Sequence, residues 1–353
     1  MSRRDANIAE ADTTDETQVA AASSKPRFFD RRGVVFVEWC VAIGLLLIAG
    51  LHVFYHDGLP ILACINAFTR YIYLPAYLCL ALAMWNRRWL LAGISAIVVA
   101  CHVMWVAPDF MPGTADNIRL SEANANSSAN RVRIFYANVR ATNTEFGPLL
   151  DEIKAANPDI IIGVEFAWHW REAFWQAGMV EKYPYNNVLK TGEWDQVFYY
   201  SRLRVQKDVD ERVTTRTVVS LNIPVGNGEL NLVALHSLRP TQLLGDDYQS
   251  YWNQVLPLIE KAPRPLVVLG DFNATQYSRV YQQVKELGLR NAHEDRGRGY
   301  VTTWPNGAEP IPPIRIDQVF LSPEIRCIDV VEGVGQGSDH KPLILDIEVP
   351  ARP

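Results

Sequence analysis

Several short apolar runs in the second half of this sequence end in side chains that can bind a cation or transfer a proton. The run at 266–269 leads to Asp271 and Asn273, and the runs at 159–164 and 230–235 are followed directly by Glu165 and His236. Comparable positions hold a further amide, two acids and a histidine, namely Asn138, Asp317, Asp339 and His340. Carboxylate and amide oxygens are ligands for a hard divalent cation, and a histidine near a carboxylate can carry a proton. Phosphoryl transfer to water requires these groups.

Each of these residues, taken alone, also has an ordinary structural explanation. Asp271 and Asn273 are common turn residues that bond their own backbone, Glu165 can be a surface carboxylate, and His236 can be a hydrogen-bonded core histidine. Asp317 is the exception, because it falls inside the apolar strand predicted at 314–321. A carboxylate there costs free energy unless it has a partner, and a histidine is the natural one.

Short strands with one clear helix among them must position these groups. Apolar or alternating runs predict strands at 131–139, 159–164, 230–235, 266–269, 314–321 and 342–347. A helix is predicted at 144–156, capped by Asn143 or Thr144 and ended at Asn157. If the strand at 266–269 continues through its polar motif, Asp271 and Asn273 point to one side and the ring between them to the other.

Two arginines and an aromatic cluster are further candidates for a substrate site. Arg239 and Arg315 can bind a phosphate oxygen, although surface salt pairing is the commoner role. The cluster that follows Glu165 favours core packing on a helix, with an aromatic lip for lipid or substrate as the alternative; it comprises Trp168, His169, Trp170, Phe174 and Trp175.

Residues 33–107 are far more apolar than the rest and are interpreted as a membrane domain. The runs at 33–54 and 89–107 are each long enough to span a bilayer, and 59–85, which contains Arg70 and Pro75, is interpreted as a third span. Residues 1–32 are predicted to be a disordered cytoplasmic tail, and 108–130 a flexible linker. All the chemical motifs fall within 131–353.

Basic residues beside the spans predict the orientation. Arg31 and Arg32 precede the first span, and Arg87 and Arg88 precede the last. Both clusters lie on the cytoplasmic side only if there are three spans. The protein is then a multi-pass protein of a bacterial inner membrane, with residues 131–353 in the periplasm. With two spans the same residues would be cytoplasmic.

Composition narrows the class of partner. Residues 131–353 hold 24 of the 34 Lys and Arg residues and 28 of the 39 Asp and Glu residues, a net charge of −4. An acidic domain is a poor partner for nucleic acid, although a local basic patch would not show in this sum. Four of the five cysteines lie in the apolar block, which leaves Cys327 alone and excludes an intradomain disulfide or a cysteine zinc site. No protein partner is evident.

The order of these motifs resembles the endonuclease/exonuclease/phosphatase superfamily, which includes pancreatic-type deoxyribonuclease, apurinic endonucleases and neutral sphingomyelinases, and its membrane-anchored bacterial branch. The matching stretches run in family order over 131–350: Ala137-Asn138-Val139, Glu165, Leu235-His236, Gly270-Asp271-Phe272-Asn273, Ile316-Asp317 and Ser338-Asp339-His340. The fold that this resemblance implies is a four-layer α/β sandwich, two mixed β-sheets face to face with helices outside.

The resemblance also implies roles. Asn138, Glu165 and Asp339 would hold Mg²⁺ or Mn²⁺. His340 would be the general base for the attacking water, oriented by Asp317. Asp271 and Asn273 would position the nucleophile and the phosphate, and His236 would assist the transition state or the leaving group. The sequence departs from the family at Gln276-Tyr277, where many relatives have proline and tryptophan, and at Gln318, where membrane-linked bacterial relatives often have histidine.

The sequence therefore predicts a membrane-anchored, divalent-metal-dependent hydrolase of ester bonds. Its substrate would be a phosphodiester of nucleic acid, a phospholipid headgroup or a small phosphoester. The alternative is a catalytically silent module of the same fold that binds a partner at the membrane. Retention of both Asp317 and His340 argues against this alternative, since a silent domain has no use for the pair.

Overall fold

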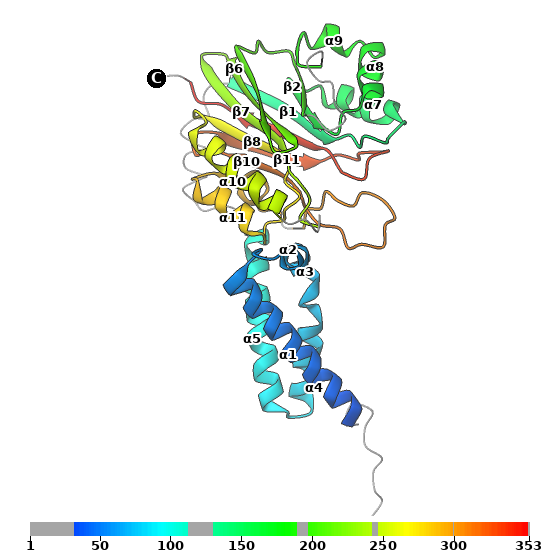
Figure 1. The fold of residues 1–353 in the computed structure, drawn as a ribbon, viewed down its shortest axis with the longest axis vertical. Coiled ribbons are helices and arrows are strands. Elements are labelled where there is room, and N and C mark those ends of the chain that lie inside the picture. Colours follow the sequence, from blue (N-terminus) through cyan, green and yellow to red (C-terminus); the bar gives the residue numbers. More distant parts are fainter. Residues whose placement is uncertain (1–31, 112–129, 189–196, 242–245, 299, 352–353) are drawn as a thin grey trace, which may run out of the picture.

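The computed structural model describes residues 32–111, 130–188, 197–241, 246–298 and 300–351. Within these residues the chain forms two six-stranded mixed sheets packed face to face, with helices on both outer faces and a helical bundle below (Figure 1). The predicted four-layer α/β sandwich with apolar N-terminal helices is confirmed.

The first sheet has the order β11-β12-β1-β2-β4-β3. β1 pairs in parallel with β2 and antiparallel with β12, so the sheet is mixed. The bounds of its strands are Arg131–Asn138 (β1), Ile160–Val164 (β2), Tyr185–Asn186 (β3), Phe198–Ser201 (β4), Arg326–Glu332 (β11) and Leu343–Glu348 (β12).

The second sheet has the order β5-β6-β7-β8-β10-β9, and β7 and β8 are its parallel pair. Its strands are Lys207–Val213 (β5), Arg216–Val225 (β6), Gly228–His236 (β7), Leu266–Asp271 (β8), Arg290–Asn291 (β9) and Asp317–Leu321 (β10). β10 begins at Asp317, so this residue is the first of its strand and not inside it as predicted. The hydroxyl of Thr303 accepts the backbone N–H groups of Ile316 and Asp317, which replaces ladder bonds just before the strand.

Apolar side chains fill the space between the two sheets and the space between each sheet and its outer helices. The inner faces of both sheets bury mainly Val, Ile and Leu between them, as strands covered on both sides require. Trp170 and Phe174 join the apolar cluster on the outer face of the first sheet, and Trp252 and Phe272 join the cluster on the outer face of the second. The sandwich therefore holds the ends of its strands in a fixed arrangement.

In the described part of the chain, six helices accompany the sheets. They are α7 (Phe146–Ala156), α8 (Trp168–Gln176), α9 (Met179–Lys182), α10 (Asp246–Lys261), α11 (Arg279–Glu286) and α12 (Ala292–Asp295). α7 begins after Glu145, and not after Asn143 or Thr144 as predicted. The Asn143 side chain forms a turn just before the helix, since its oxygen accepts the Glu145 N–H at 2.8 Å. The predicted end at Asn157 is confirmed; this residue has φ 49°, the left-handed conformation that ends many helices.

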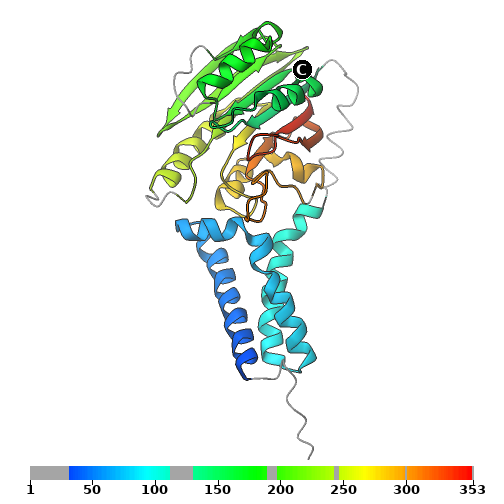
Figure 2. The same cartoon turned by 90° about the vertical axis from the view of Figure 1, so that its right-hand side faces the viewer.

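The N-terminal bundle contains α1 (Arg32–Tyr55), α2 (Pro60–Ala67), α3 (Thr69–Ile72), α4 (Leu74–Trp85), α5 (Trp89–Val106) and the 3-10 helix η2 (Ala107–Phe110). Two stretches, 32–55 and 89–110, are long and apolar enough to cross a membrane, and 60–67 with 69–85 is a third if this pair, bent by 67°, counts as one span. The start of α1 lies at the end of the bundle far from the sandwich (Figures 1 and 2). Inside the bundle the buried acid Glu38 is paired with Arg88.

Candidate active site

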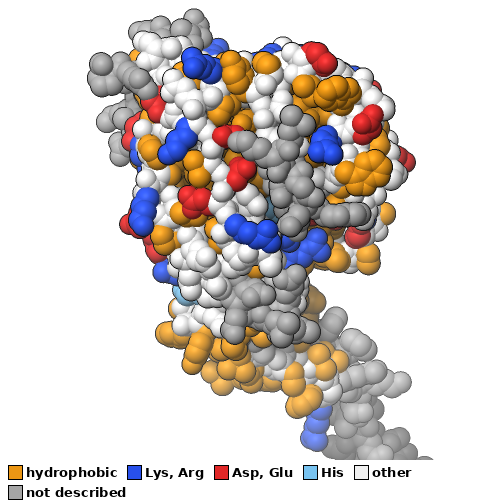
Figure 3. All heavy atoms as spheres, turned by 45° about the horizontal axis from the view of Figure 1, so that its top comes forward, with side chains coloured by type: hydrophobic (Ala, Val, Ile, Leu, Met, Phe, Trp, Pro, Cys, Tyr) orange, Lys and Arg blue, Asp and Glu red, His pale blue; other side chains and the backbone are white. Residues whose placement is uncertain are grey.

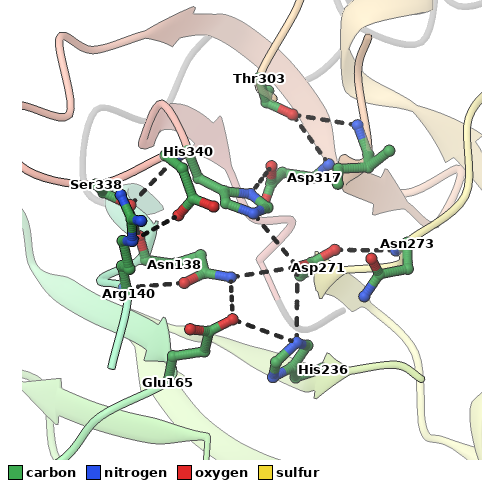
Figure 4. Close-up of polar contacts among 12 residues, drawn as sticks. Asn138, Arg140, Glu165, His236, Asp271, Asn273, Thr303, Asp317, Ser338 and His340 are labelled. Atoms are coloured by element: carbon green, nitrogen blue, oxygen red, sulfur yellow. Dashed lines mark hydrogen bonds and ion pairs between the residues drawn. The ribbon is translucent and has the colours of Figure 1, made fainter. Parts of the chain in front are cut away.

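One edge of the sandwich brings the predicted chemical groups together, because each sheet places the ends of a parallel strand pair there. Asn138 ends β1 and Glu165 directly follows β2, while His236 and Asp271 end β7 and β8 opposite each other. The start of β10 adds Asp317, and the loop before β12 adds its own acid and histidine (Figure 4). Residues up to 200 positions apart thus meet, as in the bond from Ser338 Oγ to the Asn138 carbonyl.

His340 and Asp317 form a buried pair. Nδ1 of His340 lies 2.8 Å from Asp317 Oδ2, and the Tyr136 hydroxyl donates to the other oxygen at 2.9 Å. Burial alone would lower the pKa of His340, but the charges of Asp317 and Asp271 raise it to about 9. With Nδ1 engaged by the carboxylate, Nε2 is the nitrogen that faces the rest of the site.

Asp271 lies between the two histidines. Its Oδ2 is 3.8 Å from His340 Nε2, 3.6 Å from His236 Nε2 and 3.2 Å from the Asn138 amide nitrogen. Burial raises the pKa of Asp271, against the attraction of His340. The carboxylate is therefore held among groups that can exchange protons with one another.

His236 is almost fully buried and differs from His340 in charge. Burial lowers its pKa to about 4, although the charge of Asp271 opposes this shift. The imidazole is neutral at neutral pH, whereas that of His340 carries a proton. The two histidines, on opposite sides of one carboxylate, thus have pKa values shifted in opposite directions.

Glu165 adopts a backbone conformation that an L residue avoids, with φ 60°. Its Oε1 accepts from the Asn138 amide at 3.0 Å and its Oε2 from the Ala141 N–H at 3.2 Å. Burial would raise its pKa, but His236 and these two donors lower it, so the side chain is an anion. Strained backbone of this kind concentrates at functional sites.

Asn273 does not continue the strand as the alternation predicted. It has φ 47°, and its N–H donates to Asp271 Oδ1 at 2.9 Å. Asp271 and Asn273 therefore form a turn closed by a side-chain-to-backbone bond, which is common for these residue types. Its amide nitrogen donates to the Ser237 carbonyl at 3.1 Å. Asn273 therefore ties the end of β8 to the end of β7, and its amide nitrogen keeps a second N–H that can donate to a ligand.

Asp339 is the most exposed of the predicted ligands, with 24% of its side chain accessible, and its Oδ1 lies 3.8 Å from Arg140 Nε. The loop that carries it is fixed because the Ser338 hydroxyl bridges the Asn138 carbonyl and the His340 N–H.

The two arginines differ in position. Arg239 is exposed beside the end of β7. Arg315 is only 3% exposed and lines a cavity of about 10 Å³ at the contact with the helical bundle. Burial of Arg315 makes the predicted surface salt pairing wrong.

Arg216, at the start of β6, is a further residue near the site that was not predicted from the sequence. Burial lowers its pKa, and the charges of Glu165 and Asp271 act against this shift, so the guanidinium lies near both. The sequence signal would have been the hairpin Val213-Thr214-Thr215-Arg216, whose turn ends at this edge of the sheet. The aromatic cluster is divided, since Trp170 and Phe174 are core residues whereas Trp168 and Trp175 are 68% and 60% exposed.

Two sets of side chains could hold a divalent cation. The ligand atoms of Asp271, Asp317 and His340 all lie within 4.8 Å of one another. In this set both oxygens of Asp317 already have partners, since one accepts from the Tyr136 hydroxyl and the other lies against Nδ1 of His340. The second set, Asn138, Glu165 and Asp339, consists of hard oxygen donors at the more accessible side of the site, and its chemistry fits Mg²⁺ or Mn²⁺ better.

A four-layer sandwich with acids, amides and two histidines at one edge defines a class of phosphoester hydrolases. The profile of the "Endonuclease/Exonuclease/phosphatase family" matches residues 124–340, and the chain belongs to this family. Members of the family are hydrolases of phosphoester bonds and generally use divalent metal ions.

Solved structures agree with this fold. TDP2 of D. rerio in complex with a single-strand DNA product is 17% identical, with a TM-score of 0.52 over 62% of this chain and 99% of that one. A family protein from Beutenbergia cavernae is 16% identical, with a TM-score of 0.50 over 62% of this chain and 72% of that one. Another from Bacteroides thetaiotaomicron is 15% identical, with a TM-score of 0.50 over 64% and 100%. No curated protein sequence matches the chain.

Proposed function

We propose that this protein is a membrane-anchored phosphodiesterase that hydrolyses its substrate by attack of a water activated by His340. The observation that carries the proposal is the buried chain of Asp317, His340 and Asp271, in which one imidazole bridges two carboxylates on neighbouring strands. The family supports the class of reaction, and the geometry supports the roles of the individual residues.

In the proposed reaction, the water oxygen bonds to phosphorus as the bond to the leaving alcohol breaks. His340 Nε2 takes the proton from water, Asp317 holds the ring and stabilises the charged imidazole, and Asp271 orients the water. The leaving oxygen departs with the electron pair of the broken P–O bond and takes up a proton from solvent, and His236 and Asn273 contact the phosphate or this oxygen. Because general-base action needs the neutral ring, a pKa of about 9 for His340 predicts a rate that rises with pH through the neutral range.

Asn138, Glu165 and Asp339 would hold the ion, Mg²⁺ or Mn²⁺. When bound, it offsets the negative charge of the phosphate oxygens. Arg216 and Arg239 add positive charge to the site. Both lie near the end of β7 in the second sheet, where His236 is.

We place the protein in a bacterial inner membrane with three spans, a cytoplasmic tail at 1–32 and a periplasmic catalytic domain at 131–353. Support comes from the two long apolar helices and the bent pair, and from the basic residues beside the spans. In Figure 3 the coloured side chains on the face away from the bundle mix acidic and basic groups, which favours a lipid or small phosphoester over nucleic acid.

The test is hydrolysis of bis(p-nitrophenyl) phosphate, p-nitrophenyl phosphate, DNA and phospholipid vesicles by the full chain in detergent, with Mg²⁺, Mn²⁺ or EDTA. We expect metal-dependent turnover that is lost in Glu165→Ala and His340→Ala but kept in Asp151→Ala, a change at an exposed acid of α7. Turnover that survives His340→Ala would refute the mechanism. Absence of turnover with every ester would favour the silent binding module. A reporter fused after Pro353 tests the topology, and a cytoplasmic signal would contradict three spans.

A further inference from the structure

Asp109, at the end of the last apolar helix, joins the helical bundle to the sandwich. Its Oδ2 accepts from Arg70 at 2.8 Å, from the Gln276 amide at 2.9 Å and from the Tyr277 hydroxyl at 2.8 Å. Arg70 belongs to the bundle, whereas the other two donors follow β8 in the sandwich. Asp109 lies in the interval predicted to be a flexible linker, yet residues 107–110 form η2.

All four side chains are buried, with exposed fractions between 5% and 8%. A buried carboxylate is costly unless a positive charge and hydrogen bonds compensate it, and an arginine in an apolar helical segment is costly for the same reason. Each of these two charges therefore requires the other. The pair joins α3 to η2 within the bundle, and the bonds from Gln276 and Tyr277 attach the loop after β8 to the same carboxylate.

The loop from Ala274 to Ser278 continues directly from Asn273 in the active site. Gln276 is three positions after Asn273, which limits their Cα distance to about 11 Å. Inside the sandwich the Gln318 amide holds the same loop by donating to the Ala274 carbonyl at 3.0 Å. The loop is thus bonded from one side by β10 and from the other by the bundle.

A second contact joins the bundle to the chain segment that leads into Asp317. The Tyr71 hydroxyl donates to the Pro313 carbonyl at 2.6 Å, four residues before this acid. A cavity of about 10 Å³ lies at this contact, lined by Ala67 and Arg70 from the bundle and by Thr275 and Arg315 from the sandwich. The bundle therefore packs closely against both segments that enter the active site.

We propose that Asp109 is a positioning residue for the reaction: by accepting from Gln276 and Tyr277 it fixes the loop at 274–278 and, through it, the turn of Asp271 and Asn273. The helical bundle is then a part of the working enzyme and not only an anchor. This proposal rests on the proposed function, since it concerns the geometry of that same site.

The experiment measures hydrolysis of bis(p-nitrophenyl) phosphate with Mn²⁺ by the full chain and by its variants Asp109→Asn and Tyr277→Phe, all in lipid nanodiscs. Asp109→Asn keeps the shape of the side chain but removes its charge, and Tyr277→Phe removes a single hydroxyl if the first variant does not fold. The matched control is Asp57→Asn, at another acid of the same contact, whose oxygen accepts the Arg279 N–H at 2.7 Å. Amide hydrogen exchange of residues 274–278 is measured on the same samples.

We expect kcat to fall ~10-fold in Asp109→Asn and ~3-fold in Tyr277→Phe with KM little changed, because a small displacement of a catalytic group lowers the chemical step rather than binding. Amide exchange at 274–278 should become ~10-fold faster in Asp109→Asn, while the strands of both sheets keep their protection. Asp57→Asn should leave both quantities within about twofold of the original chain.

Unchanged kcat and unchanged exchange in Asp109→Asn would overturn the proposal. Equal losses in Asp57→Asn and Asp109→Asn would overturn it too, because docking in general and not the loop would then matter. If the original chain hydrolyses no ester, the proposed function fails on its own, and the exchange rates alone decide the positional role of Asp109: faster exchange at 274–278 supports it and unchanged exchange rejects it.

Discussion

Asp271 and Asp317 lie directly opposite each other on the antiparallel strands β8 and β10. Two buried carboxylates in such a register repel each other. The ring of His340 is placed between them, 2.8 Å from one and 3.8 Å from the other, and its positive charge offsets theirs. The strand register thus creates the electrostatic field that raises the pKa of His340 and makes it the centre of the site.

The first prediction concerns the orientation of this ring. In Asp317→Asn, the amide can donate to Nδ1 and stabilise the wrong tautomer, so we expect kcat to fall at least ~100-fold, as in catalytic triads. The fold should survive, since the change preserves shape and Tyr136 can still bond the amide oxygen. Steady-state kinetics on bis(p-nitrophenyl) phosphate measure the effect, with Asp151→Asn as the exposed control. A kcat within about twofold of the original chain would remove Asp317 from the mechanism.

The second prediction separates the two candidate cation sites. Glu165→Gln removes a carboxylate from the set with Asn138 and Asp339, so Mn²⁺ affinity should fall by about 10–100-fold or more. Titration calorimetry or the Mn²⁺ resonance signal measures it. Glu172→Gln on α8, an exposed residue bonded to Gln176, is the matched control and should bind Mn²⁺ normally.

The opposite result has a specific meaning. If Glu165→Gln keeps the affinity and Asp317→Asn loses it, the ion is bound by Asp271, Asp317 and His340, whose ligand atoms lie within 4.8 Å of one another. The roles proposed for both sets would then have to be exchanged.

The sequence predicted the strands that carry chemistry because each has an apolar or alternating run with a polar residue at or near one end. Asn138, Glu165, His236 and Asp271 could be placed at one edge, since the carboxyl ends of parallel strands meet there. β5 was not predicted, because five of its seven residues are charged and it lies at the edge of its sheet, so it has little apolar signal.

What could not be predicted depends on contacts distant in sequence or on backbone angles. Asn273 leaves the strand because its φ is 47°, which no periodicity indicates. Arg216 reaches the site only through the pairing of β6 with β7. Asp109 lies in a Pro- and Asn-rich interval that reads as a linker, and its three donors are up to 168 positions away.

The third prediction concerns the glycine before Asp271. Gly270 has φ 152°, and a Cβ at this position would lie 1.9 Å from the Leu235 carbonyl oxygen on the neighbouring strand. Neither backbone can move without displacing His236 or Asp271, so Gly270→Ala should lower the free energy of unfolding by about 3–5 kcal/mol. Thermal unfolding in detergent measures the change. Gly147→Ala in the first turn of α7, where nothing lies within 4 Å of the added atom, should change the free energy of unfolding by no more than about 0.5 kcal/mol. Equal melting temperatures for the two variants would contradict this account.

The last prediction is a pH dependence of stability that arises away from the active site. His293 is fully buried in α12, its Nε2 lies 2.9 Å from Glu332 Oε1, and its backbone N–H bonds Asn291. Burial lowers its pKa from 6.5 to about 4, against the hydrogen bond to Glu332, while the charges of Arg315 and Arg298 also oppose protonation. The unfolded chain therefore binds this proton more readily than the folded one. The stabilising contribution is complete above pH 6.5 and is lost as the pH falls towards 4, at up to about 1.4 kcal/mol per pH unit. The pKa of Glu332 is lowered by His293 despite burial, so its contribution to stability is lost in the same direction at still lower pH.

Denaturant unfolding of the original chain and of His293→Gln, which can still donate to Glu332, between pH 4.5 and 8 measures the difference. The gap between the two curves should shrink as the pH falls below 6.5, and curves that stay parallel across this range would show that His293 does not titrate with folding.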